Sequence, residues 1–315
     1  MRPLCRPVKV FISVVFVTLM VVQTSFARSS IEESRDLDKM GYIISISDCG
    51  PYVFHFSERS RKMAVEVERL ICESAPDIAE EIGLQDPGRI DVYIVPNRKD
   101  YNQLSGSKMP EWGEAFSDLV NRKIVIDARA VLRTPRPLKT VIRHELSHIF
   151  LVQKTGGTRC PTWFVEGIAM RQSREWTMSD QWNLMTSIWS GNLPDLEDLG
   201  GSFPRSAARA SAAYRLSYAA VSRLLETRPE DLVTLLSFAR DLGDFDRAFL
   251  LTFGETTGDF AEEFHLDLES RYNAAAPVFR SPPFWLMMAG LLILAYVLKK
   301  IRNRKRIREW ESEEV

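Results

Sequence analysis

The segment from Leu138 to Gln153 constrains the fold most, because it is strongly apolar yet places two histidines and a glutamate at its centre. Apolar residues lie around most of its circumference, which predicts a helix buried in the protein. Its sequence from His144 to His148 has the form H-E-x-x-H. Residues four apart share a helix face, so His144 and His148 point toward one place, with Glu145 beside it. Buried polar side chains need partners, and a bound metal ion would supply them.

The chemistry of these side chains indicates Zn²⁺. Two neutral imidazoles suit this ion, and an adjacent carboxylate can take a proton from a metal-activated water. The chain has only 4 histidines, and two of them fall at this spacing around a glutamate. The alternative is a pair of unrelated polar residues on a surface helix. The apolar neighbours favour the metal.

Glu166 is predicted to be the third metal ligand. It stands in an apolar stretch, residues 162–170, that is predicted to form a helix after Pro161. A lone carboxylate in such a stretch is costly unless it is paired or metal-bound. Two histidines and one glutamate leave the fourth zinc position open, as a catalytic site requires. The alternative is a glutamate exposed on the side of its helix.

Both ends of the chain predict a membrane context. Residues 1–27 combine Arg2, Arg6 and Lys9 with an apolar run and end in Ser-Phe-Ala, which predicts a secretory signal peptide cleaved after Ala27; an uncleaved anchor is the alternative. Residues 282–298 carry no charge and predict a transmembrane helix, with a buried core helix as the alternative. The basic cluster in residues 299–315 predicts a cytoplasmic tail. The body, residues 28–281, is therefore expected outside the cytoplasm, in the periplasm if the cell is Gram-negative.

The charge of this body bears on its binding partners, and its cysteines bear on its disulfides. Residues 28–298 carry 31 basic and 38 acidic residues, and an acidic body argues against nucleic acid as a partner. Cys49, Cys72 and Cys160 remain once a signal peptide is removed. Cys49 and Cys72 could form a disulfide in an oxidising compartment, which would leave Cys160 free. Packing is the expected role of Cys160, ahead of a zinc thiolate.

The remaining patterns predict an α+β protein with its strands in the N-terminal half of the chain. Strands are expected at residues 42–46, 52–56 and 90–95, and a helix over 58–82 is expected to break or bend at Pro76. Residues 119–127 predict a hairpin turning at Asn121-Arg122. Its edge could bind an extended peptide by strand addition; the alternative is a covered strand. Leader residues 28–40 are expected to have limited order.

Two motifs together resemble a known family. The H-E-L-S-H segment, followed by W-F-V-E-G-I-A at residues 163–169, is similar to the gluzincin metallopeptidases. It most resembles the bacterial peptidase MA-like group, whose second motif reads W-[FL]-x-E-G-x-A. The similarity continues weakly through residues 193–264 and covers roughly residues 90–272, but only the two zinc motifs are diagnostic. One departure is His265, where the group often has tryptophan.

The resemblance implies a zincin-like fold. An N-terminal mixed sheet with helices and an active-site helix would precede a helical C-terminal half, with one transmembrane helix at the end. It also implies a zinc-dependent endopeptidase acting on protein or peptide substrates, in which Glu145 is the general base. Related enzymes use a tyrosine or histidine to stabilise the oxyanion, and Tyr218, ahead of Tyr214, is expected to serve here. Aromatic core packing is the alternative for both tyrosines.

Two other functions remain open from the sequence. One is a membrane-anchored binding or scaffolding protein that keeps a zincin fold without catalysis. The other is a zinc hydrolase of a non-peptide bond, such as a cell-wall amide. The intact H-E-x-x-H with its following glutamate argues against the first, and the sequence shows no separate wall-binding module for the second.

Overall fold

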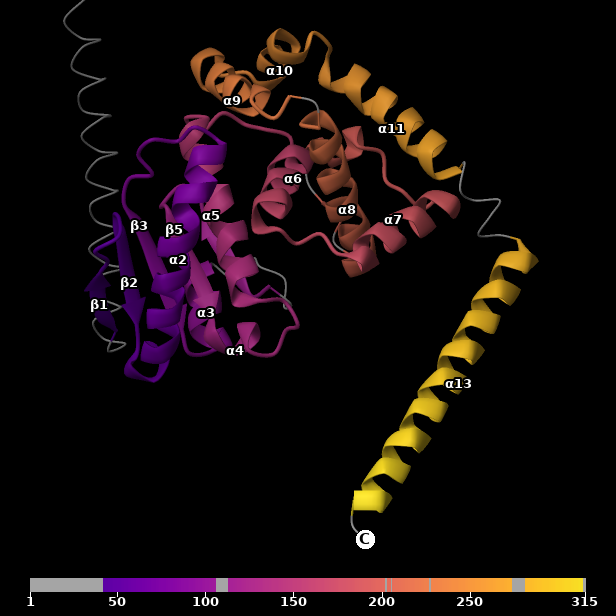
Figure 1. The fold of residues 1–315 in the computed structure, drawn as a ribbon. Helices are drawn as coiled ribbons and strands as arrows, with labels where there is room; N and C mark the ends of the chain where they lie inside the picture. Colours follow the sequence, from indigo (N-terminus) through magenta and orange to yellow (C-terminus); the bar gives the residue numbers. More distant parts are fainter. Residues whose placement is uncertain are drawn as a thin grey trace, which may run out of the picture. The chain divides into compact units, whose positions relative to one another are not determined.

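A computed structural model describes residues 42–105, 113–201, 203–204, 206–226, 228–273 and 281–313 (Figure 1). The predicted signal peptide, residues 1–27, and the leader 28–40 lie outside these ranges. The chain divides between Lys154 and Thr155 into two compact units. The first unit holds all five strands of the described sheet, and the second unit is helical in its described part. The predicted α+β class is confirmed.

The sheet of the first unit is mixed, as predicted. Its strand order is β1-β2-β3-β5-β4, with β2, β3 and β5 parallel and the two outer strands antiparallel to their neighbours. The strands are β1 (Ile43–Ile46), β2 (Tyr52–Phe56), β3 (Ile90–Val95), β4 (Ala115–Asp118) and β5 (Lys123–Asp127). All residues of β2 and β5 are buried, as expected for central strands covered on both faces.

The hairpin β4–β5 differs from the prediction in where it turns. Leu119 and Val120 were expected in the first strand, but β4 ends at Asp118 and the turn takes the four residues Leu119–Arg122. The carboxylate of Asp118 accepts hydrogen bonds from the backbone N–H groups of Val120 and Asn121, at 3.2 and 3.0 Å. An aspartate that bonds its own following backbone in this way stops strand pairing early.

Helix α2 (Arg61–Glu81) continues through Pro76, so the expected break does not occur there. It follows the short 3₁₀ helix η1 (Glu58–Ser60) and buries an apolar face that includes Val67, Ile71 and Ile78. That burial on both sides of the proline outweighs the one backbone hydrogen bond that proline removes. A disulfide joins Cys72 of α2 to Cys49, which lies between β1 and β2, so the anticipated pair forms.

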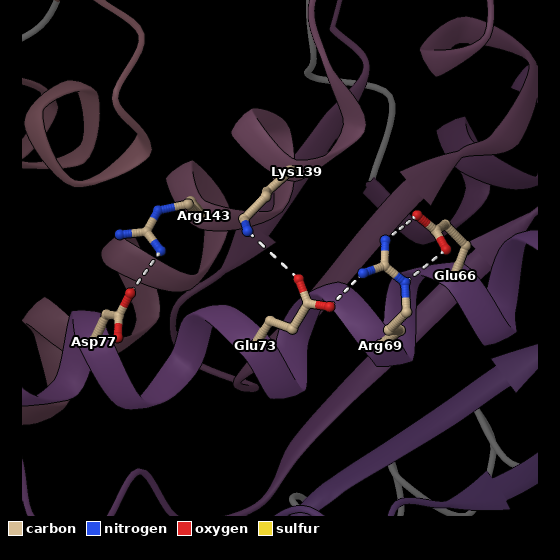
Figure 2. Close-up of polar contacts among 6 residues, drawn as sticks. All are labelled: Glu66, Arg69, Glu73, Asp77, Lys139 and Arg143. Carbon is tan, nitrogen blue, oxygen red and sulfur yellow. Dashed lines mark hydrogen bonds and ion pairs between the residues drawn. The ribbon is translucent and has the colours of Figure 1, made fainter.

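Helix α5 (Leu138–Lys154) carries the H-E-x-x-H segment and is mostly buried, as predicted. Figure 2 shows ion pairs between α5 and α2: Lys139 Nζ lies 3.4 Å from Glu73 Oε2, and Arg143 lies 3.6 Å from Asp77 Oδ2. Lys139 and Arg143 lie on one side of α5. The side that carries the two histidines is about 140° away around the helix axis. Helix α5 is thus held to α2 along one side and presents His144 and His148 on another.

The first unit is completed by α3 (Arg98–Ser105) and α4 (Ala128–Val131). The second unit contains a run of helices joined by short connections (Figure 1). They are α6 (Thr162–Ser173), α7 (Met178–Trp189), η2 (Glu197–Gly200), α8 (Ala207–Leu224), α9 (Asp231–Leu242), α10 (Phe245–Phe253) and α11 (Thr257–Asn273). Helix α8 begins at Ala207, and its first turns, residues 207–212, are rich in alanine, which favours helix.

Helix α13 (Pro282–Glu313) includes the predicted membrane segment. Its part from Pro282 to Asn303 is long and apolar enough to cross a membrane. The helix continues past Leu298 into the basic sequence instead of ending with the apolar run. Length and composition of this helix are therefore compatible with a single-pass anchor.

Candidate metal centre

Helix α5 brings the two histidines of the motif together. The rings of His144 and His148 lie 4.7 Å apart between centroids, with their planes at 87°. His144 is buried and His148 is half-buried. Two imidazoles on successive turns of one buried helix can offer ring nitrogens to the same ion.

Glu145 is buried beside them and is held by a strand. The hydroxyl of Ser117, in β4, lies 2.6 Å from Glu145 Oε2 and 3.0 Å from the Glu145 carbonyl oxygen, and can donate to either. Strand β4 lies at the edge of the sheet, so the contact joins this edge to the centre of α5. Sequence reasoning missed Ser117, because nothing in the spacing of residues 117 and 145 links them.

Glu145 contributes to the raised pKa of a buried tyrosine, Tyr101. Burial, followed by the negative charge of Glu145, raises the pKa of Tyr101 well above its ordinary value. Tyr101 lies in α3, is fully buried and packs edge-on against Phe116 of β4 at 5.6 Å. Its phenol therefore stays protonated at neutral pH.

Glu166 is positioned by close packing of α6 on α8. It is half-buried in α6, and the next residue, Gly167, is buried. A Cβ placed on Gly167 would lie only 2.4 Å from the carbonyl oxygen of Ser217 in α8. Gly167 therefore has a steric reason to be glycine: it lets two helix backbones approach next to the glutamate.

Gly167→Ala is expected to lower the free energy of unfolding by about 1–3 kcal/mol, because the added methyl meets backbone atoms that must move. Without this clash, alanine would stabilise a helix interior by roughly 1 kcal/mol. Denaturant unfolding of the full chain in detergent measures the change. Gly200→Ala is the matched control, since a Cβ there meets nothing within 4 Å. Equal stability of the two variants would contradict the packing argument.

The structure groups the three predicted metal ligands. The candidate ligand atoms of His144, His148 and Glu166 all lie within 4.8 Å of one another. This set of two imidazole nitrogens and one carboxylate oxygen fits Zn²⁺, which accepts both donor types in a tetrahedral site. The residues present therefore fit the expected metal, and the set by itself does not distinguish zinc from other ions that bind imidazole.

The two tyrosines considered for the oxyanion both lie on α8, and each has an aromatic neighbour. The ring of Tyr218 stacks on Trp176, with centroids 4.2 Å apart and planes 8° apart. Tyr214 contacts Phe203 edge-on at 4.8 Å. Both side chains are half-buried. Stacking fixes the ring of Tyr218 in one plane.

The remaining histidines and the free thiol have other surroundings. His55 is buried, stacks on Tyr93 and bonds to Asp91 Oδ1 at 2.8 Å. His265 is half-exposed on α11, 3.4 Å from Glu269. Cys160 is not in a disulfide, and burial raises its pKa to about 12, so the thiol stays protonated. These groups are consistent with structural roles.

No known protein-family profile matches the chain, and no curated protein matches it in sequence. What can be said of its function therefore depends on the site itself.

Proposed function

We propose that the chain is a membrane-anchored zinc metallopeptidase of the gluzincin type, acting outside the cytoplasm. The observation that carries this proposal is the grouping of His144, His148 and Glu166 within 4.8 Å, with Glu145 next to the first histidine in the sequence. Zinc, when bound there, supplies a Lewis acid that polarises a carbonyl and lowers the pKa of water. A zincin-like fold is part of the same proposal.

The chain's own residues have distinct tasks in the mechanism. His144, His148 and Glu166 hold the ion, and Glu145 is the base that takes a proton from water and delivers it to the leaving amine nitrogen. Ser117 orients the Glu145 carboxylate through its 2.6 Å contact with Oε2. Tyr218, with Tyr214 as the alternative, donates its hydroxyl to the oxygen that develops negative charge.

Three features support a location outside the cytoplasm. The Cys49–Cys72 disulfide is typical of oxidising compartments. The segment Pro282–Asn303 can span a membrane, and basic residues gather at its C-terminal end. The positive-inside rule places that end in the cytoplasm, which puts the body on the opposite side.

The proposal is tested by metal analysis and proteolysis with the full chain purified in detergent. We expect about one zinc ion per chain, cleavage of an unstructured protein such as casein, loss of cleavage on chelation and its return with added zinc. Elemental analysis and gel-based cleavage measure these results. A preparation with no zinc, and with no uptake of added zinc, would rule out the proposed site.

A further inference from the structure

Helix α7 carries an apolar stripe that faces away from its buried side. Met178, Trp182, Met185 and Trp189 are spaced by four, three and four residues, which puts them within a sector of roughly 60° on the helix. Met178 is 85% exposed and Trp182 is 42% exposed. Met185 and Trp189 are half-buried. A tryptophan and methionine stripe this exposed is unusual on a surface that only water contacts.

The other two faces of α7 have different characters. Leu184, which is buried, lies on the side of the helix that packs into the unit. Ser179, Asn183 and Ser190 are exposed on a polar side, about 120° around the helix axis from Leu184. The apolar stripe is therefore a third face, between a packed side and a polar side, and it contains no charged residue. Tryptophan side chains on an apolar face suit the interfacial plane of a membrane, where tryptophan is enriched.

Helix α7 is fastened to the end of α11, just before the chain continues to its apolar segment. The Trp189 indole donates to the Tyr272 carbonyl oxygen at 3.1 Å, and the Gln181 side-chain amide donates to the Tyr272 hydroxyl. Figure 1 shows α7 beside the C-terminal end of α11. Pro282, where the span begins, is ten residues after Tyr272. Even a fully extended chain of ten residues covers at most about 36 Å.

We propose that the exposed end of this stripe, Met178 and Trp182, inserts into the lipid headgroup region of the bilayer that the chain's own anchor crosses. The short connection keeps α7 near that surface, and the uncharged stripe matches the boundary between headgroups and acyl chains. Trp182 and Met178, the most exposed members, enter furthest. The second unit then contacts the membrane at two places, α13 and α7, and cannot rotate freely about its tether. This inference rests on the membrane anchor in the proposed function and not on catalysis.

The test measures the depth of single nitroxide labels on the full chain reconstituted into phosphatidylcholine–phosphatidylglycerol vesicles. Labels are placed at Met178→Cys and, as the matched control on the polar face, at Asn183→Cys. Both variants carry Cys5→Ser and Cys160→Ser, so that the label has one target. Paramagnetic collision measurements compare access of oxygen, which concentrates in lipid, with access of a water-soluble nickel complex. Flotation of the same samples reports whether the chain is in the membrane at all.

We expect the oxygen-to-nickel access ratio to be several-fold higher at position 178 than at position 183 in vesicles, and the difference to vanish when Trp182→Ser is added. A chain that floats with equal, water-like ratios at both positions would overturn lipid docking and leave the anchor intact. A chain that does not float would overturn both the anchor and the docking that depends on it. Strong spin–spin coupling between labels at position 178 would assign the stripe to a second copy of the chain instead. None of these readings depends on peptidase activity.

Discussion

Glu145→Gln is expected to reduce peptide cleavage by about 10²–10⁴-fold, the range that a general acid–base residue contributes. Glutamine keeps the shape of the side chain and an oxygen that can accept from Ser117, so the 2.6 Å contact that holds residue 145 has an equivalent. It cannot take a proton from water at neutral pH. Zinc content and fold should therefore match the wild type, while turnover is lost.

The measurement is the initial rate of cleavage, with zinc content determined on the same samples. Glu73→Gln is the matched control: it makes the same chemical change in the ion-pair network of Figure 2, where Glu73 meets Arg69 and Lys139. Exposed pairs of this kind contribute about 0–1 kcal/mol, so activity should stay near the wild-type value. Full activity of Glu145→Gln would remove Glu145 from the mechanism.

Ser117→Ala is expected to reduce activity less than Glu145→Gln does. Removing the hydroxyl removes the hydrogen bond from Ser117 to the Glu145 carboxylate, and a hydrogen bond to a charged group is worth about 1.5–3 kcal/mol. We expect kcat to fall about tenfold or more with little change in KM, and Ser117→Thr to recover part of the loss. A change in KM alone, or equal losses in the alanine and threonine variants, would argue that Ser117 matters only for the structure of the edge strand.

The Glu145→Gln comparison also separates the rival functions. A binding or scaffolding protein would hold zinc yet show no cleavage difference between wild type and variant on any substrate. A hydrolase of cell-wall amides would leave casein intact but release new amines from peptidoglycan only when Glu145 is present. Both rivals make the wild type inactive toward unstructured protein, so the first assay already distinguishes them from a peptidase.

Periodicity predicted the buried helix around His144 and His148 because its apolar residues surround the helix, a signal that depends on local sequence alone. The same kind of signal existed for α9, where Leu232, Leu235, Leu236 and Ala239 are buried, and Gly243 follows the helix in a left-handed conformation. Helix α9 was nevertheless absent from the prediction, although its pattern was readable. Helix α7 was harder to predict, because much of its apolar surface faces outward instead of forming one buried stripe.

Contacts between distant segments were not predictable in the same way. The Ser117–Glu145 hydrogen bond depends on which strand lies at the sheet edge. The spacing of residues within one segment does not predict the order of strands in a sheet. The need for glycine at position 167 depends on α8 crossing α6 at Ser217. The predicted position of the hairpin turn was wrong because the Asp118 side chain accepts hydrogen bonds from the backbone that follows it, and this ends the strand early. Tertiary and side-chain-to-backbone contacts thus account for what the sequence patterns left out.

Glu166→Ala is expected to weaken zinc binding by well over 100-fold, since loss of an outer partner of a metal ligand already costs about 10–100-fold. Glu166 is the predicted ligand that α6 adds to the two histidines of α5. Without it, two imidazoles remain, and a protein site with two ligands is weaker than one with three. Competition with a chromophoric chelator measures the affinity, and circular dichroism reports the fold.

Two further variants separate coordination from general loss of charge. Glu262→Ala removes an exposed carboxylate from α11 of the same unit and should leave zinc affinity unchanged. Glu166→Asp keeps a carboxylate but shortens it by one methylene, so it should bind zinc more weakly than wild type and more tightly than alanine. If Glu166→Ala bound zinc as tightly as wild type, the ion would be held by other residues. The gluzincin assignment would then fail, even if Glu145 proved essential, because the third ligand is what distinguishes this class from other H-E-x-x-H sites.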